Sequence, residues 1–123
     1  GGARTHLMLI CRIDGQDYLA DAGFGGPAPL VPLRIDLDTP QTAPNGRFVL
    51  HGDPSTGERV LSRLGPGGPF PLYGFDNAHV TDPDIAAANH LCTRWTATPF
   101  PHHLMVKGHD GDTSLSLLDR QLT

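Results

Sequence analysis

The stretch that decides the fold reads Thr5-His-Leu-Met-Leu-Ile-Cys-Arg-Ile13, then Asp14-Gly15, then Gln16-Asp-Tyr-Leu-Ala-Asp21. Two runs rich in β-forming residues flank an Asp-Gly pair, and this pattern predicts a β-hairpin. A type I′ turn needs positive φ at both central residues, which Asp-Gly tolerates well. With a two-residue turn, the numbers of facing residues sum to 29, so Asp21 is expected to face Met8.

The same register predicts that His6 lies two positions from Met8 on one face of the hairpin. Diagonal neighbours lie about 7–8 Å apart, so His6 and Asp21 can pair where the glycine loop Gly23-Phe-Gly-Gly-Pro27 begins. A carboxylate that orients an imidazole prepares it to act as the base for a nucleophile. On geometry alone the alternative stays open that both are ordinary residues of a strand and its end.

The rest of the chain predicts a mainly β fold with one helix. Gly 15 and Pro 12 make up 27 of 123 residues, too many for a helical bundle. The helix is expected to start at Thr81-Asp82-Pro83 and to run to about Thr93, because a cap residue and an early proline favour a helix start. Strands are expected near residues 31–37, 48–50, 59–64, 72–75, 103–107 and 114–118, and loops at 38–46 and 65–71.

Composition narrows the classes of partner. Nine Lys+Arg against 13 Asp+Glu give a net charge of −4, which argues against nucleic acid and anionic membrane surfaces. The longest apolar run, residues 7–11, is far shorter than the roughly 20 residues of a membrane span. No signal peptide is visible, and Cys11 and Cys92 are expected to be free thiols of a cytoplasmic protein. The spacing of His90, Cys92, His102 and His103 does not predict a metal site.

Three segments resemble one enzyme family: Arg4-Thr-His-Leu-Met-Leu9, Leu19-Ala-Asp-Ala-Gly-Phe-Gly-Gly26 and Pro32-Leu-Arg34. They are similar to arylamine N-acetyltransferases, in which Thr-His precedes an apolar strand and an Asp-Val-Gly-Phe-Gly motif follows. The spacing of 15 from His6 to Asp21 and the glycine loop match together. Weaker similarity lies at residues 72–75, Asn89, 104–106 and 118–123.

The resemblance implies the antiparallel β-barrel portion of an α+β, cysteine-protease-like acetyltransferase, with residues 1–78 in the barrel domain and 79–123 starting an α/β lid domain. It implies a Cys-His-Asp triad that moves an acetyl group from acetyl-CoA to an arylamine, arylhydrazine or arylhydroxylamine by a ping-pong mechanism. His6 is then the base and Asp21 its orienter. Thr5, Gly23 and Gly25 match positions near the coenzyme, and Phe24 matches the substrate pocket.

The chain departs from the family at two places. The Arg-Cys-Gly-Gly-x-Cys segment that holds the nucleophile is absent, and neither Cys11 nor Cys92 has its context. We therefore expect a fragment that is inactive alone and needs the missing N-terminal helical domain or self-association. Arg94-Trp-Thr96 stands where the family has Thr-His-Pro. Two alternatives remain: an amide synthase that releases a polyketide by lactam formation, and a non-catalytic β domain that binds a partner through the glycine loop.

Overall fold

The computed structural model describes residues 5–111 and 113–123, so Arg4 and Asp112 of the predicted motifs and turns lie outside it. The chain divides into two compact units, each described by itself. The sheet unit contains residues 8–77, and the helix unit contains the described residues 5–7, 78–111 and 113–123. Within the described residues there are three antiparallel sheets and one α-helix, so the predicted mainly β class is confirmed.

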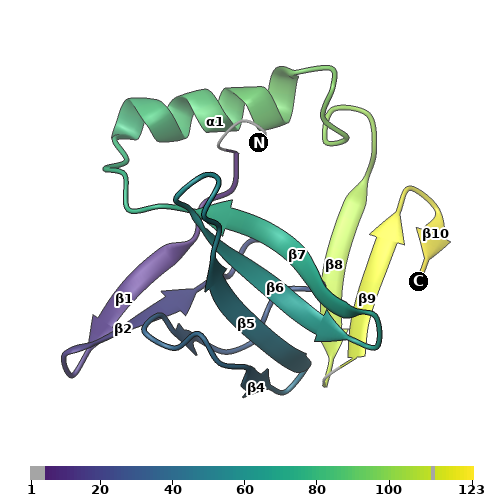
Figure 1. Cartoon of the computed structure of the whole chain (residues 1–123). Coiled ribbons are helices and arrows are strands. Elements are labelled where there is room, and N and C mark those ends of the chain that lie inside the picture. The colour runs from purple at the N-terminus through teal and green to yellow at the C-terminus, as the bar shows by residue number, and fades with distance from the viewer. Residues whose placement is uncertain (1–4, 112) are drawn as a thin grey trace. The chain divides into compact units, whose positions relative to one another are not determined.

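The sheet unit begins with the predicted hairpin of β1 (Leu9–Ile13) and β2 (Gln16–Ala20), seen in Figure 1. The pairs run from Leu9 with Ala20 to Ile13 with Gln16, so the predicted sum of 29 is confirmed. Asp14 and Gly15 have φ of 50° and 78°, the positive values that the tight turn requires. Local turn chemistry therefore fixes the register of the hairpin.

The first strand is shorter than the predicted span from residue 5 to residue 13. It begins at Leu9, and residues 5–8 have no strand structure. The register explains the difference. The pair after Leu9 and Ala20 would be Met8 and Asp21, but the chain leaves the sheet at Asp21. The pleat argument that placed His6 on the face of Met8 is therefore wrong, since it needs a continuous strand.

A third strand on the hairpin and one further, larger sheet complete the sheet unit. β3 (Leu33–Arg34) pairs with β2, and it is shorter than the predicted strand over residues 31–37. The larger sheet has the order β4-β5-β6-β7. Its strands are β4 (Gln41–Ala43), β5 (Gly46–Gly52), β6 (Arg59–Gly65) and β7 (Gly68–Phe75). The predicted pairing of residues 48–50 with 59–64 is confirmed.

The two predicted loops in this part are wrong. The loop at 38–46 contains β4, and the loop at 65–71 contains the first half of β7. Pro69 and Pro71 suggested a loop, but β7 is an edge strand, where a residue without an N–H is tolerated. The glycines at 65 and 68 instead close a tight turn, with Gly68 at φ 98°.

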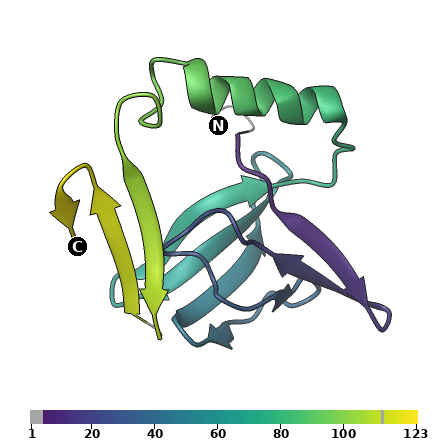
Figure 2. The same cartoon turned by 180° about the vertical axis from the view of Figure 1, so that it is seen from behind.

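The core of the sheet unit lies between the two sheets. Figure 2 shows the chain between β2 and β4 running in front of the β5–β7 strands, and Leu33 packs in one cluster with Phe48. Burial of apolar surface at such contacts is the main favourable term in folding. The buried members of this cluster are Leu19, Leu33, Ala43, Phe48, Leu50 and Leu61.

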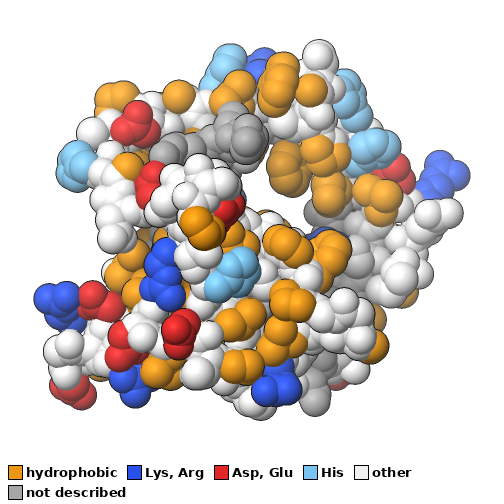
Figure 3. Space-filling view, in the orientation of Figure 1, with side chains coloured by type: hydrophobic (Ala, Val, Ile, Leu, Met, Phe, Trp, Pro, Cys, Tyr) orange, Lys and Arg blue, Asp and Glu red, His pale blue; other side chains and the backbone are white. Residues whose placement is uncertain are grey.

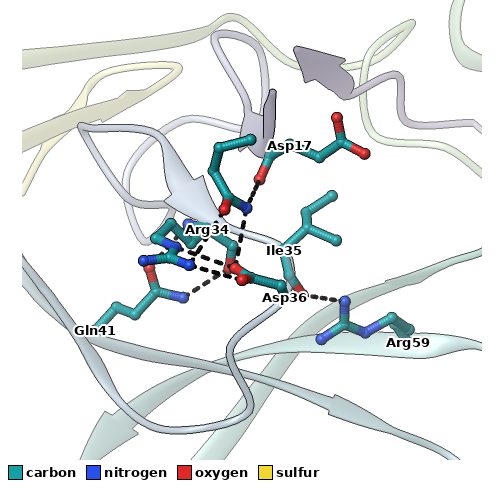
Figure 4. A network of polar contacts seen from close by, with 7 residues as sticks. Asp17, Arg34, Ile35, Asp36, Gln41 and Arg59 are labelled. Atoms are coloured by element: carbon teal, nitrogen blue, oxygen red, sulfur yellow. Dashed lines mark hydrogen bonds and ion pairs between the residues drawn. The ribbon is translucent and has the colours of Figure 1, made fainter. Parts of the chain in front are cut away.

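Polar contacts join β3 to its neighbours, as Figure 4 shows. The Gln41 side chain accepts a hydrogen bond from the Arg34 N–H and donates one to the Arg34 carbonyl, both at 2.8 Å. The Arg34 guanidinium also donates two hydrogen bonds to the Asp36 carboxylate. The Gln16 side chain donates a third hydrogen bond to the same carboxylate at 3.0 Å. Arg59 donates to the carbonyl of Ile35. A two-residue strand is thus supported by side chains that satisfy its backbone.

The helix unit contains α1 (Asp82–Arg94), close to the predicted span. Asp84 Oδ2 accepts hydrogen bonds from the Thr81 N–H at 2.9 Å and the Thr81 hydroxyl at 2.7 Å, which fixes the start of the helix. β8 (Met105–Asp110), β9 (Thr113–Leu118) and β10 (Gln121–Leu122) form the third sheet. Asp119, at φ 53°, accepts from the Leu104 N–H at 2.9 Å and from His103 Nδ1 at 2.8 Å.

No described residue of the helix unit is buried. Figure 3 shows hydrophobic side chains on the visible surface, both along α1 and over the β5–β7 sheet. Leu104 and Leu122 are 59% and 71% exposed. The described helix is neither long nor apolar enough to cross a membrane.

Candidate active site

Asp21 ends β2 and starts the glycine loop. Its Oδ1 accepts hydrogen bonds from the backbone N–H groups of Gly23 at 3.0 Å and Phe24 at 3.1 Å. Aspartate side chains commonly stabilise turns in this way. Gly25 has φ 86°, which favours glycine, and its carbonyl accepts from the Ala28 N–H at 2.9 Å. The structure thus brings together Asp21, Gly23, Phe24 and Gly25 from the sequence prediction.

Asn45 in the turn between β4 and β5, and Arg63 of β6, hold the chain at the end of the loop and just after it. Asn45 accepts from the Leu30 N–H at 3.1 Å and donates to the Ala28 carbonyl at 2.7 Å. Arg63 donates to the Pro27 carbonyl at 3.1 Å and to the carbonyl of Asn45. Neither was predicted from the sequence, because the contacts that give them this role span 15 to 36 residues.

An apolar groove lies beside the start of the glycine loop. It is lined by Leu9 and Ala20 of the hairpin, by Asp21 and Ala22, and by residues 29–32. Among these described residues Asp21 carries the one ionisable side chain. Leu30 and Val31 are 39% and 37% exposed, so the groove is open to a ligand or to another protein surface. Its shape depends on the position of residues 29–32, which Asn45 holds through Leu30.

Tyr73 of β7 is a third residue of this site that was not predicted from the sequence. Its ring lies 5.1 Å from the Phe24 ring, at an interplanar angle of 55°. Burial raises the pKa of the Tyr73 hydroxyl well above its usual range, and the nearby carboxylate of Asp21 raises it further. Tyr73 therefore stays neutral and adds no charge to the site.

Thr5 and His6 belong to the helix unit and are exposed. The Thr5 carbonyl accepts a hydrogen bond from Cys92 Sγ at 3.6 Å. His6 and Asp21 thus lie in different units, and their pairing stays a prediction. Cys11 and Cys92 are free thiols.

Other candidate groups are structural. His51 Nε2 lies 3.1 Å from Ser62 Oγ, but Ser62 is fully buried and offers no accessible nucleophile. In the part of the chain that the structure describes, no three His, Cys, Asp or Glu side chains are grouped to hold a metal ion.

Comparisons with known proteins agree on one family. A profile of the N-acetyltransferase family matches residues 1–123. The arylamine N-acetyltransferase of Escherichia coli (strain K12) is 31% identical over 108 residues, which are 86% of this chain and 37% of the relative. The arylamine N-acetyltransferase / N-hydroxyarylamine O-acetyltransferase of Salmonella typhimurium is 29% identical with the same coverage, 86% and 37%.

Solved structures give the same result. The Mycobacterium marinum arylamine N-acetyltransferase in complex with CoA superposes with a TM-score of 0.89 at 26% identity, covering 99% of this chain and 45% of that one. The Salmonella typhimurium enzyme gives 0.86 at 27% identity, covering 95% and 42%. The fold is thus a portion of a cysteine-protease-like acyltransferase. The chain belongs to the arylamine N-acetyltransferase family, and it spans 37% of the length of its curated relatives.

Replacing Asn45 by alanine is expected to loosen the chain over residues 28–30. Two backbone groups lose their partners, so the free energy of unfolding is expected to fall by about 1–3 kcal/mol. Asn45→Asp keeps the acceptor for Leu30 but places a carboxylate oxygen against the Ala28 carbonyl, so it is expected to lower the stability as well. Urea unfolding measures both, with Asn77→Ala, an exposed asparagine, as control. Equal stability of Asn45→Ala and the control contradicts the proposed clamp.

Tyr73 is expected to ionise only when the protein unfolds. Its raised pKa contributes stability that is complete below the ordinary tyrosine pKa of about 10 and is lost as pH rises towards the folded-state value. Because the chain has two tyrosines, Tyr18→Phe leaves Tyr73 as the one reporter. Tyrosinate absorbance should then appear together with loss of the β-sheet circular dichroism signal. Titration near pH 10 in a folded protein contradicts the assignment.

Proposed function

We propose that this chain is the part of an arylamine N-acetyltransferase that carries the catalytic histidine, His6, and the aspartate that orients it, Asp21. The observation that carries the proposal is the glycine loop anchored on Asp21 in a chain of this family. The complete enzyme moves an acetyl group from acetyl-CoA to an arylamine, arylhydrazine or arylhydroxylamine. Membership of the family supports the reaction class, and a relative solved with CoA supports the coenzyme.

The first half-reaction uses a cysteine thiol outside this chain. His6 takes the thiol proton, the thiolate attacks the thioester carbon of acetyl-CoA, and coenzyme A leaves with the proton returned by His6. In the second half-reaction the amine attacks the acetyl-cysteine, His6 takes its proton, and the cysteine leaves. Asp21 fixes the tautomer of the imidazole and stabilises its charged form.

The remaining proposed roles concern binding of the coenzyme and of the amine. Thr5, Gly23 and Gly25 are proposed to lie beside the coenzyme, because glycines let the backbone approach a ligand closely. Phe24 is proposed to contact the aromatic amine. Its ring lies 5.1 Å from the ring of Tyr73, a contact that limits the positions open to it.

The partner of this chain is proposed to be a helical domain that supplies the nucleophile. The chain spans 37% of one curated relative and 45% of one solved relative, which leaves room for that domain. The exposed apolar residues Leu9, Leu30 and Val31 around the groove support docking of another surface. A cytoplasmic location and the division into a barrel at 1–78 and a lid at 79–123 stay predictions.

The chain alone is expected to give no turnover with acetyl-CoA and an arylamine. A chimera in which it replaces the matching segment of the Escherichia coli relative should be active. In that chimera His6→Ala and Asp21→Asn should each lower kcat by at least about a thousandfold, because each removes a member of the triad. Acetylation of the arylamine, followed by chromatography, measures the rates.

Two exposed residues serve as controls, His90→Ala for the histidine and Asp38→Asn for the aspartate. Wild-type rates in His6→Ala or Asp21→Asn remove the triad assignment. Turnover by the chain alone refutes its status as a part of the enzyme. An active chimera that uses a polyketide thioester but refuses acetyl-CoA identifies the amide synthase, and an inactive chimera that binds a partner through the loop identifies the binding domain.

A further inference from the structure

The segment that carries His6 is tied to the last turns of α1. Cys92 Sγ lies 3.6 Å from the Thr5 carbonyl oxygen, a hydrogen-bond distance for a thiol donor. Both residues belong to the helix unit, so the contact is internal to one compact part of the chain. Cys92 is half-buried, whereas Thr5 and His6 are exposed. An exposed segment is thus anchored through its backbone to a side chain on a helix.

The helix end that presents Cys92 is itself held in place. The Thr98 hydroxyl donates to the carbonyls of Cys92 at 3.1 Å and Trp95 at 2.9 Å. The Trp95 N–H donates to the Leu91 carbonyl at 3.2 Å. These bonds satisfy carbonyls that a helix end otherwise leaves open, and they order the turn around Cys92. The Cys92 thiol therefore belongs to an ordered helix end.

A bond to the Thr5 carbonyl acts directly on His6. The Thr5 oxygen and the His6 nitrogen belong to one planar peptide group, because the peptide bond resists rotation. Holding the oxygen fixes the plane from which the His6 backbone continues. The direction of the imidazole then depends only on the backbone angles of His6 and on its side-chain rotamer.

We propose that Cys92 is a positioning residue for His6, acting through the Thr5 carbonyl. The inference rests on the proposed role of His6 as the base, and it gives the second cysteine a role other than nucleophile. The thiol of Cys92 is committed to a backbone acceptor. Displacement of a catalytic group by about 1 Å can cost about a hundredfold in rate, so even a weak anchor at this point affects catalysis.

The test uses the chimera that carries the whole 123-residue chain. Cys92→Val keeps the approximate volume and removes the donor, and kcat is expected to fall about tenfold while KM for the arylamine stays unchanged. Cys92→Ser keeps a donor and should recover most of the rate. Cys11→Val is the matched control, because it removes the other free thiol, which lies on β1.

A double-mutant cycle separates positioning from general stability. In the His6→Ala background, Cys92→Val should cause no further loss, because the group that it positions is absent. A further tenfold loss there, or an equal loss in Cys92→Ser and Cys92→Val, overturns the proposal. The proposed function fails by a different result, full activity of His6→Ala itself.

Spectroscopy on the same chain supplies a readout independent of turnover. With labelled histidine, the imidazole resonances of His6 should move in Cys92→Val and return towards wild type in Cys92→Ser. The resonances of His51, which lies in the sheet unit, should stay in place in both variants. Unchanged His6 resonances in a folded Cys92→Val protein overturn the proposal.

Discussion

The carboxylate of Asp21 is the group on which the site of the sheet unit depends. It accepts hydrogen bonds from the N–H groups of Gly23 and Phe24, and its charge raises the pKa of the buried Tyr73 hydroxyl. The two hydrogen bonds turn the chain away from β2, so β1 has no pairing partner before Leu9 and begins there. They also place Phe24, whose ring packs against Tyr73 of β7 in the other sheet. One side chain thus ends the pairing of the hairpin and begins the loop. A carboxylate held in this way is pre-organised for the orienting role that we propose for Asp21.

The sequence predicts the features whose cause is local. Asp14-Gly15 sets the hairpin register, and Thr81 with Asp84 sets the start of α1, because each depends on residues close in the chain. Predictions failed where a distant partner decides. The strand at 41–43 forms because β5 lies beside it. Residues 5–8 form no strand because the chain leaves the sheet at Asp21 and offers them no partner. The proline-rich start of β7 is tolerated because nothing pairs with its outer edge in the described sheet.

The same distinction applies to the candidate site. Asp21 and the glycines could be found from the sequence through their resemblance to a family motif, whereas the geometry of the hairpin alone left an ordinary structural role open. Asn45 and Arg63 could not, because their importance lies in contacts with residues 27–30, which their own neighbours in the sequence do not reveal. Tyr73 reads as an ordinary strand residue until its hydroxyl is placed beside Asp21. Supporting residues of a site are therefore harder to predict than the residues they support.

The two units differ in how they achieve order. The sheet unit has a core of buried apolar residues, whereas the described helix unit buries none and is held by caps and clamps such as Asp119 on Leu104. Net hydrogen bonds contribute only about 0.5–1.5 kcal/mol each, so such a unit gains most of its stability when its apolar faces are covered. Thr5 and His6 belong to the helix unit, and Asp21 belongs to the sheet unit. On the roles proposed for these residues, the orienting carboxylate thus lies in the unit with a buried core, and the base lies in the unit whose described residues bury no side chain. Covering the apolar faces of the helix unit is therefore the step from which the proposed base would gain most order.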